Sequence, residues 1–261
     1  MRDRLQPMTR VSIAYLPKDE PLRVIDAARA VAEAGFLPVP HIPARRIPSA
    51  AALQDFLARL AGEAGVRDLF VIAGDPAKPA GAFTQSLDIL KDGALTRLGY
   101  RSVGFAGHPE GHPDVGETIL LEALRAKLKF ASDAGLATEI VTQFCFDPDL
   151  VECWLEKVRA INRSVLVRVG IPGPADATTL IKFAARCGVG ASKSVLKKYG
   201  LSLTRLFARV SPDGFVADIE RRVGPADPAV AFHVYPFGGL TESAAWMDNY
   251  ISRSPMEEIG A

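Results

Sequence analysis

Polar residues gather at two neighbouring points of the chain, each associated with an apolar run. His108, Glu110 and His112 stand in a turn rich in glycine and proline directly after the run 103–106, and Gln143 stands near the end of the next run. Histidine and glutamate side chains can carry protons in catalysis. The amide of Gln143 offers one acceptor and two donors in one plane, which suits the edge of a heterocycle. These residue types predict a site that binds a polar ring and moves a proton.

Two more polar residues follow apolar runs upstream. Asp75 lies in a small Gly-Asp-Pro turn, and His41 lies between prolines at the end of an earlier run. Each also has a structural reading, because an aspartate in such a turn commonly caps the next helix and a histidine can be a partly buried, hydrogen-bonded side chain. The spacing of His108 and His112 in a Pro/Gly turn is not the helical spacing that aligns two imidazoles on zinc. No metal site is therefore predicted.

The elements that must position these residues are strands that alternate with helices. Seven apolar runs, separated by amphipathic segments, indicate buried strands that pair in parallel through right-handed crossovers. The carboxyl ends of such strands lie at one edge of the sheet, where α/β folds bind their ligands. The expected strands are 11–16, 36–42, 68–73, 103–106, 140–146, 164–171 and 230–237.

The chain length of 261 residues fits a (β/α)₈ barrel, which takes about 250 residues. The composition shows no shift that would mark a boundary, so residues 1–261 predict one α/β domain of the TIM-barrel type. A doubly wound open sheet is the alternative, but no Gly-x-Gly-x-x-Gly follows the first strand. Residues 190–223 predict two or three further helices, and 241–251 predict a closing helix.

The composition argues against several classes of partner. Lys and Arg number 31 against 30 Asp and Glu, and no basic stripe interleaved with aromatic residues is present, so nucleic acid is not expected. The three cysteines have neither metal-ligand spacing nor an even count, which favours a reduced, cytoplasmic compartment. No segment approaches the ~18 uninterrupted apolar residues of a membrane span. A soluble protein without a membrane partner is expected.

The order and spacing of these motifs resemble the methylenetetrahydrofolate reductase family. Its patterns Tyr-Pro-Glu-x-His-Pro, Lys-x-x-x-Asp-Ala-Gly-Ala and Ile-Thr-Gln-x-x-Phe-Asp are similar to the segments around Glu110, Asp133 and Gln143. Its Leu-Arg-Gly-Asp-Pro is similar to the turn at Asp75, and the histidine of its His-Leu-Thr-Cys strand is similar to His41. The matching segments are 72–76, 107–113, 129–135, 140–147 and 169–172, with a fainter match at 233–235.

The resemblance implies a TIM barrel that transfers a hydride to or from a one-carbon unit on tetrahydrofolate, normally through FAD reduced by NADH or NADPH. It implies that Asp75 lies near the pterin and the flavin, and that Gln143 binds the folate. We expect Asp75 and Glu110 to be catalytic and Phe144 to add a substrate contact. The residues implied to lie around the flavin are His41, Gly74, His108, His112 and Asp133.

Departures from the family pattern leave the cofactor open. The run 11–15 aligns better with the family's second strand than with its first, so the first βα unit, with the glutamate that serves as general acid, is expected to be missing or modified. Ala14, Ala73 and His108 replace a threonine, an arginine and a tyrosine of the family pattern. Either FAD is retained, or a nicotinamide passes its hydride directly to the folate.

The leading functional hypothesis is an oxidoreductase that interconverts 5,10-methylenetetrahydrofolate and 5-methyltetrahydrofolate. The proton would come from Glu110, Asp75 or a histidine. A catalytically silent folate-binding or regulatory subunit is the alternative, and another one-carbon lyase or transferase is a third. A barrel short of one unit must cover its open edge, for which a homo-oligomer is one solution.

Overall fold

The computed structural model describes residues 4–187, 209–223, 227 and 229–253. Seven parallel strands form the main sheet in the order β1-β2-β3-β4-β5-β6-β9, and a two-stranded antiparallel sheet joins β7 to β8. The strands are β1 (Arg10–Ile13), β2 (Leu37–Pro43), β3 (Asp68–Ile72), β4 (Ser102–Gly107), β5 (Ala137–Phe144), β6 (Leu166–Pro172), β7 (Ala175–Asp176), β8 (Arg209–Val210) and β9 (Val230–Tyr235).

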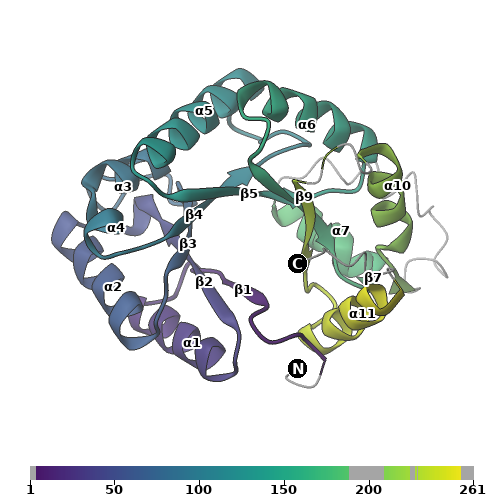
Figure 1. The fold of residues 1–261 in the computed structure, drawn as a ribbon, viewed down its shortest axis with the longest axis horizontal. Helices are drawn as coiled ribbons and strands as arrows, with labels where there is room; N and C mark the ends of the chain where they lie inside the picture. Colours follow the sequence, from purple (N-terminus) through teal and green to yellow (C-terminus); the bar gives the residue numbers. More distant parts are fainter. Residues whose placement is uncertain (1–3, 188–208, 224–226, 228, 254–261) are drawn as a thin grey trace, which may run out of the picture.

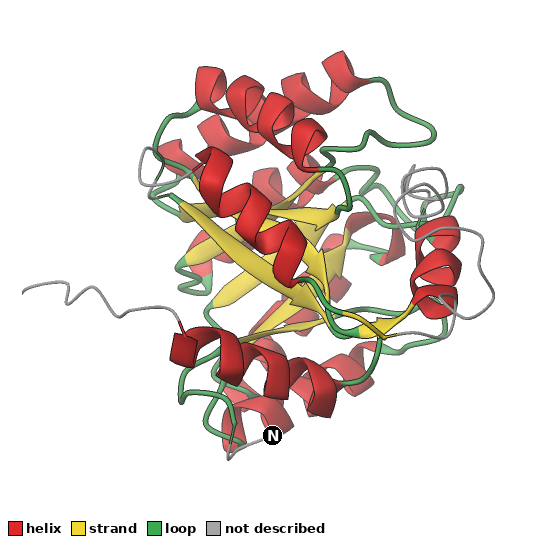
Figure 2. Ribbon diagram, turned by 90° about the vertical axis from the view of Figure 1, so that its right-hand side faces the viewer, coloured by secondary structure: helices red, strands yellow, loops and turns green. Residues whose placement is uncertain are grey.

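Helices connect the strands and lie outside them (Figures 1 and 2). They are α1 (Pro21–Glu33), α2 (Ala50–Glu63), α3 (Ser86–Asp92), α4 (Ala94–Arg97), α5 (Glu117–Asp133), α6 (Pro148–Ile161), α7 (Ala177–Arg186), α10 (Asp213–Val223) and α11 (Leu240–Arg253), with a 3₁₀ turn η1 (Ala44–Arg46). The curved parallel sheet inside a ring of helices is an α/β TIM-type fold, as the sequence predicts. The helices expected over residues 190–208 lie outside the described residues.

Local signals explain where the helices begin and end. The Ser49 hydroxyl caps α2 by accepting a hydrogen bond from the Ala52 N–H at 3.1 Å, and the Asp176 carboxylate caps α7 through the Thr179 N–H at 2.8 Å. Gly35 follows α1 with φ +87°, a left-handed conformation that glycine adopts without strain. These caps are interactions between residues close in the chain, so the positions of the helices follow closely from the sequence.

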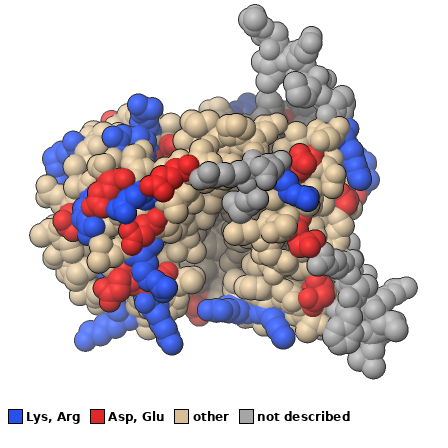
Figure 3. Space-filling view, turned by 90° about the horizontal axis from the view of Figure 1, so that it is seen from below, with Lys and Arg blue, Asp and Glu red and all other residues tan. Residues whose placement is uncertain are grey.

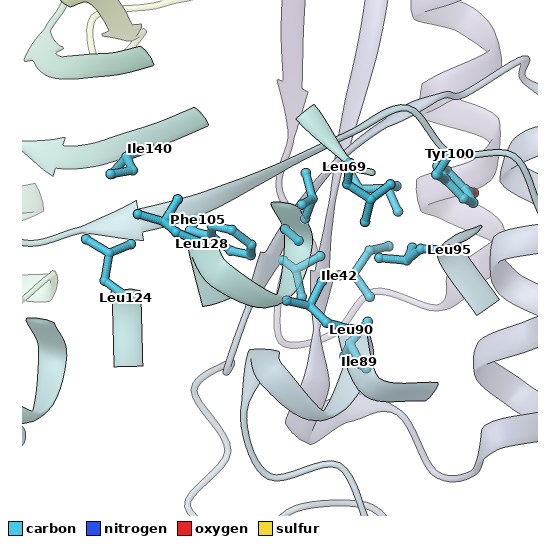
Figure 4. Close-up of a cluster of buried hydrophobic side chains, with 14 of the residues drawn as sticks. Ile42, Leu69, Ile89, Leu90, Leu95, Tyr100, Phe105, Leu124, Leu128 and Ile140 are labelled. Atoms are coloured by element: carbon cyan, nitrogen blue, oxygen red, sulfur yellow. The ribbon is translucent and has the colours of Figure 1, made fainter. Parts of the chain in front are cut away.

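The main hydrophobic core lies between the sheet and the helices. Figure 4 shows side chains of β2, β3, β4 and β5 packing against α3, α4 and α5. A smaller cluster fills the inside of the curved sheet, where Val39, Phe70 and Val141 are buried with Ile72 and Ala106 against them. Burial on both faces explains why these strands are almost wholly apolar.

The row of strands ends at β1 and β9, and among the described residues neither pairs with the other. Every described side chain of β9 is only partly buried, unlike those of the central strands. Figure 3 views the face bordered by α1 and α11 and shows a hollow between the two halves. We call this opening between β1 and β9 the seam. It stands at the place of the strand that an eight-stranded barrel would have.

Candidate functional site

The predicted polar residues follow four adjacent strands. His41 lies near the carboxyl end of β2, Asp75 just after β3, His108 just after β4, and Gln143 near the end of β5. Because these strands are parallel neighbours, their carboxyl ends form one rim. The fold therefore brings this part of the predicted site to one end of the barrel.

Asp75 is held by an arginine from the neighbouring loop. Its Oδ1 accepts hydrogen bonds from Arg46 Nη2 at 2.7 Å and Arg46 Nε at 3.2 Å. The third guanidinium nitrogen, Nη1, donates to the Pro17 carbonyl oxygen at 3.0 Å, and the guanidinium lies 6.0 Å from the centre of the Tyr15 ring. The Asp75 side chain is 62% exposed, and its Oδ2 accepts no bond from the described residues. Arg46 thus fixes the carboxylate and leaves one oxygen for a ligand.

Arg46 was not among the predicted site residues. Its position in the chain could have indicated a site residue, because it lies in η1 directly after β2, a strand that ends at the rim. It supplies a guanidinium beside the Gly-Asp turn, where the residue before the glycine is Ala73. Gly74 has φ +92°, and a Cβ there would lie 3.0 Å from Pro43 Cβ, so a glycine suits this turn.

Glu110 spans two loops. Its Oε1 accepts a hydrogen bond from the Phe146 N–H at 2.8 Å, across 36 residues of sequence. Burial raises the pKa of this carboxyl, while the backbone N–H groups of Phe146 and Asp147 act in the opposite direction. A carboxylate that accepts backbone hydrogen bonds is well placed to clamp the loop after β4 to the loop after β5. The net effect is a raised pKa, which is also the direction that a proton donor requires.

His108 and His112 form an edge-on pair with ring centroids 5.2 Å apart. The Nδ1 atom of His112 accepts a hydrogen bond from the Asp114 N–H at 3.1 Å. Burial lowers the pKa of His108 to about 4, and the neighbouring His112 and Lys127 add to that effect. The His108 ring is therefore neutral at physiological pH. No group of His, Cys, Asp and Glu side chains that could hold a metal ion occurs within the described ranges.

Gln143 lies on an irregular part of β5. The register with β6 shifts between Val141 and Phe144, which is typical of a β-bulge, a device that re-aims side chains near active sites. The Gln143 Oε1 accepts a hydrogen bond from the Phe144 N–H at 3.3 Å, and the side chain is half-buried. The amide nitrogen has no hydrogen-bond partner within the described part of the chain, so it is open to a ligand.

Two predicted residues have placements that do not suit their predicted roles. Phe144 is 0% exposed, packed edge-on against Phe146 and Tyr235, so it has no surface for a substrate. Asp133 ends α5, which returns from the rim to the start of β5, so it lies at the opposite end of the barrel. There it pairs with Lys129 on the surface. Phe144 is a packing residue, and Asp133 is removed from the other site residues.

A pocket of about 470 Å³ opens from the inside of the barrel into the seam. We call it the lumen pocket; its walls come from β1, β2, β3, β5, β6, β9 and α11. His41 and His233 both line it, and burial lowers the pKa of each to about 4. Both imidazoles are therefore neutral, with one donor and one acceptor nitrogen each. His41 lies against the Phe70 ring at 4.7 Å between centroids.

Charged residues line the same pocket as a matched set. Glu139 Oε1 accepts from Arg10 Nη2 and its Oε2 accepts from Arg168 Nε, both at 2.8 Å. Arg10 also lies 3.4 Å from Asp68. The Ser243 hydroxyl of α11 is buried at the pocket wall without a hydrogen-bond partner among the described residues. The sequence reasoning missed this set, because its members come from strands far apart in the chain.

A curved sheet of seven parallel strands with a polar rim and an internal pocket defines the described part of the chain as an α/β protein of the TIM type. The sequence profile described as methylenetetrahydrofolate reductase matches residues 10–200. The chain belongs to the methylenetetrahydrofolate reductase family. This confirms the resemblance drawn from the motifs.

Two curated relatives show the extent of the similarity. Methylenetetrahydrofolate reductase 2 of Saccharomyces cerevisiae is 30% identical over 136 residues, 48% of this chain and 21% of the relative. Methylenetetrahydrofolate reductase 1 of Schizosaccharomyces pombe is 31% identical over 129 residues, 45% of this chain and 20% of the relative. The matches thus span about a fifth of each relative. A crystal structure of D-psicose 3-epimerase in the presence of D-fructose aligns with a TM-score of 0.38 and 16% identity, covering 67% of this chain and 65% of that one.

Proposed function

We propose that this protein is an oxidoreductase that interconverts 5,10-methylenetetrahydrofolate and 5-methyltetrahydrofolate by hydride transfer. The observation that carries the proposal is that Asp75 and Gln143 follow strands of the same rim. Asp75 is held there by Arg46, and Gln143 lies on a β-bulge. These two residues stand in the motifs that the chain shares with its family. A planar amide and an open carboxylate oxygen suit the donor and acceptor edge of a pterin.

Each rim residue then has a definite task. Gln143 binds and orients the pterin edge through its amide. Asp75 offers Oδ2 to the ligand, and Arg46 keeps the carboxylate in place. Glu110 holds the two loops that border the pterin, so we assign it a clamping task in addition to the catalytic role expected from the sequence. Proton delivery falls to Asp75 or Glu110, because the neutral imidazole of His108, with its pKa lowered to about 4, accepts protons and does not act as an acid at physiological pH.

The lumen pocket suits an uncharged planar ring as the hydride carrier. Its polar groups include two neutral imidazoles and the Ser243 hydroxyl, and its aromatic walls include Phe70. Its two arginines are already paired with Glu139. This donor set fits an isoalloxazine or a nicotinamide ring. His41 and His233 would hold such a ring, which when bound supplies or takes up the hydride. We propose FAD, NADH or NADPH as the carrier.

A catalytically silent folate-binding or regulatory subunit is the second candidate. One observation favours it: one oxygen of each rim carboxylate already has a partner, since Glu110 Oε1 accepts from the Phe146 N–H and Asp75 Oδ1 accepts from Arg46. A protein that kept the pterin site without a free acid would bind folate and not turn it over.

An absorption spectrum of the freshly purified protein separates these proposals. Visible flavin bands that bleach on addition of 5-methyltetrahydrofolate would support flavin chemistry. A colourless protein that changes nicotinamide absorbance only with folate would support direct hydride transfer. Folate binding without either change would overturn the enzyme proposal in favour of the silent subunit.

Substitution of the rim carboxylate sharpens the test. Asp75→Asn should lower turnover far more than folate affinity, because the amide keeps the shape and loses the charge. Asp133→Asn is the matched control, since this carboxylate also pairs with a basic side chain but lies at the opposite end of the barrel. Equal effects of the two substitutions would remove Asp75 from the site.

A further inference from the structure

Gln143 sits where the strand ladder does not fix its position. Val141 pairs with Arg168 and Phe144 pairs with Gly170, so three steps along β5 correspond to two steps along β6. Thr142 and Gln143 lie within this bulge. A residue in a bulge is released from regular pairing, so other contacts must set its orientation.

The Thr142 hydroxyl replaces the missing ladder contact. Its Oγ1 accepts a hydrogen bond from the Gly170 N–H at 2.8 Å and donates to the Gln143 carbonyl oxygen at 2.8 Å. The Cys145 thiol donates to the same carbonyl oxygen at 3.0 Å, and the Cys145 N–H donates to the Gly170 carbonyl at 3.1 Å. Thr142 is 0% exposed. The backbone of Gln143 is therefore tied to β6 through one buried hydroxyl.

A tyrosine two strands away closes this arrangement. The Tyr235 hydroxyl of β9 donates to the Thr142 carbonyl oxygen at 2.9 Å, across 93 residues of sequence. Its ring packs edge-on against Phe144 with centroids 5.5 Å apart and also lines the lumen pocket. Burial raises the pKa of Tyr235 far above its ordinary value, so the phenol remains a donor at any working pH.

Gly170 of β6, which lies between β5 and β9, leaves room for this contact. A Cβ at Gly170 would lie 2.6 Å from the Thr142 carbonyl oxygen, 2.8 Å from the Gln143 carbonyl oxygen and 2.8 Å from Tyr235 Cε2. The first two are backbone atoms, which cannot rotate away. Gly170, Thr142 and Tyr235 therefore form one packed unit around the Gln143 peptide.

We propose that Tyr235 and Thr142 are positioning residues that hold the Gln143 amide at the rim for the pterin. The inference rests on the proposed function, in which Gln143 binds the folate. Neither hydroxyl is offered to the ligand, because both are spent on backbone groups of the bulge. Their effect on folate must pass through Gln143.

The first test compares two buried tyrosines. Tyr235→Phe removes a hydroxyl that donates to a backbone carbonyl at 2.9 Å, and Tyr100→Phe removes one that donates to the Leu57 carbonyl at 2.8 Å, remote from the rim. Both should cost similar stability. Only Tyr235→Phe should weaken binding of 5-methyltetrahydrofolate, by about fivefold, the worth of one hydrogen bond. Isothermal titration calorimetry measures this, and equal affinities of the two variants would overturn the proposal.

A double-mutant cycle tests whether the effect passes through Gln143. In a Gln143→Ala background, Tyr235→Phe should no longer change folate affinity. A full, additive loss would mean that Tyr235 acts elsewhere. If Gln143→Ala itself leaves folate affinity unchanged, the proposed function loses its binding residue, which is a different failure from that of the positioning proposal.

A readout without folate completes the design. The chain has four glutamines, so ¹⁵N-glutamine labelling gives four side-chain amide signals, and Gln143→Ala identifies the relevant one. Tyr235→Phe and Thr142→Val should shift the Gln143 amide signal. Tyr100→Phe should leave the signal in place, and so should Thr142→Ser, because serine keeps the hydroxyl. A signal that stays in place in both Tyr235→Phe and Thr142→Val would overturn the proposal whether or not folate binds.

Discussion

Glu139 links three strands inside the barrel, and loss of its charge should destabilise the fold. Its carboxylate accepts one hydrogen bond at 2.8 Å from each of two arginines, Arg10 and Arg168, and the side chain is 9% exposed. Glu139→Gln keeps the shape and removes the charge. The two guanidinium groups in the lumen then lose the carboxylate that they share. The contacts that join β5 to β1 and to β6 are weakened as a result.

The expected loss can be scaled from burial. Breaking a fully buried ion pair by removing one partner costs about 3–5 kcal/mol. Here Arg10 and Arg168 keep 27% and 25% of their side chains in water, and Asp68 still lies 3.4 Å from Arg10. We therefore expect a loss of about 2 kcal/mol, which for a chain of this size lowers Tm by roughly 4–8 °C.

The chain contains a matched control on its surface. Glu63 also accepts from two arginines, Arg29 at 2.7 Å and Arg59 at 2.6 Å, but its side chain is 36% exposed. Water and salt screen such pairs, so Glu63→Gln should change Tm little. Thermal unfolding followed by circular dichroism compares the two variants. Equal shifts would refute the argument that burial makes the Glu139 contacts important.

Three further predictions concern the rim and the lumen. Burial lowers the pKa of His41 and His233 from 6.5 to about 4, so the unfolded chain binds protons first as pH falls. The free energy of unfolding should be at its full value above about pH 6.5 and decline toward pH 4, by up to roughly 3 kcal/mol for each histidine. Urea unfolding across this range would detect the decline, and a flat profile would contradict it. Arg46→Ala should reduce kcat/KM about tenfold, because Asp75 loses a charge-assisted hydrogen-bond partner; steady-state kinetics with unchanged values would remove Arg46 from the site. Ser243→Ala should not lower Tm, since the buried hydroxyl has no partner among the described residues, and a clear loss would reveal an unrecognised contact.

The rim itself followed from the sequence. Apolar runs with a two-residue or helical period are local patterns that can be recognised in the sequence. Each of the seven expected strands therefore corresponds to a strand of the main sheet. Because parallel strands share one direction, the positions of His41, Asp75 and Gln143 at one rim followed from strand order alone. The same logic would have excluded Asp133, since a helix that leaves the rim ends at the other side of the barrel.

Only the tertiary structure decided which partners these residues have. Arg46 pairs with Asp75 across 29 residues, and Tyr235 reaches Thr142 across 93. Periodicity cannot predict such contacts, because they depend on how neighbouring loops and strands approach one another in space. Phe144 shows the same limit: the sequence placed it beside Gln143, but the bulge and the aromatic cluster turned it into the core. The sequence by itself determined the scaffold and the residue types at its rim, and three-dimensional packing decided how each is held.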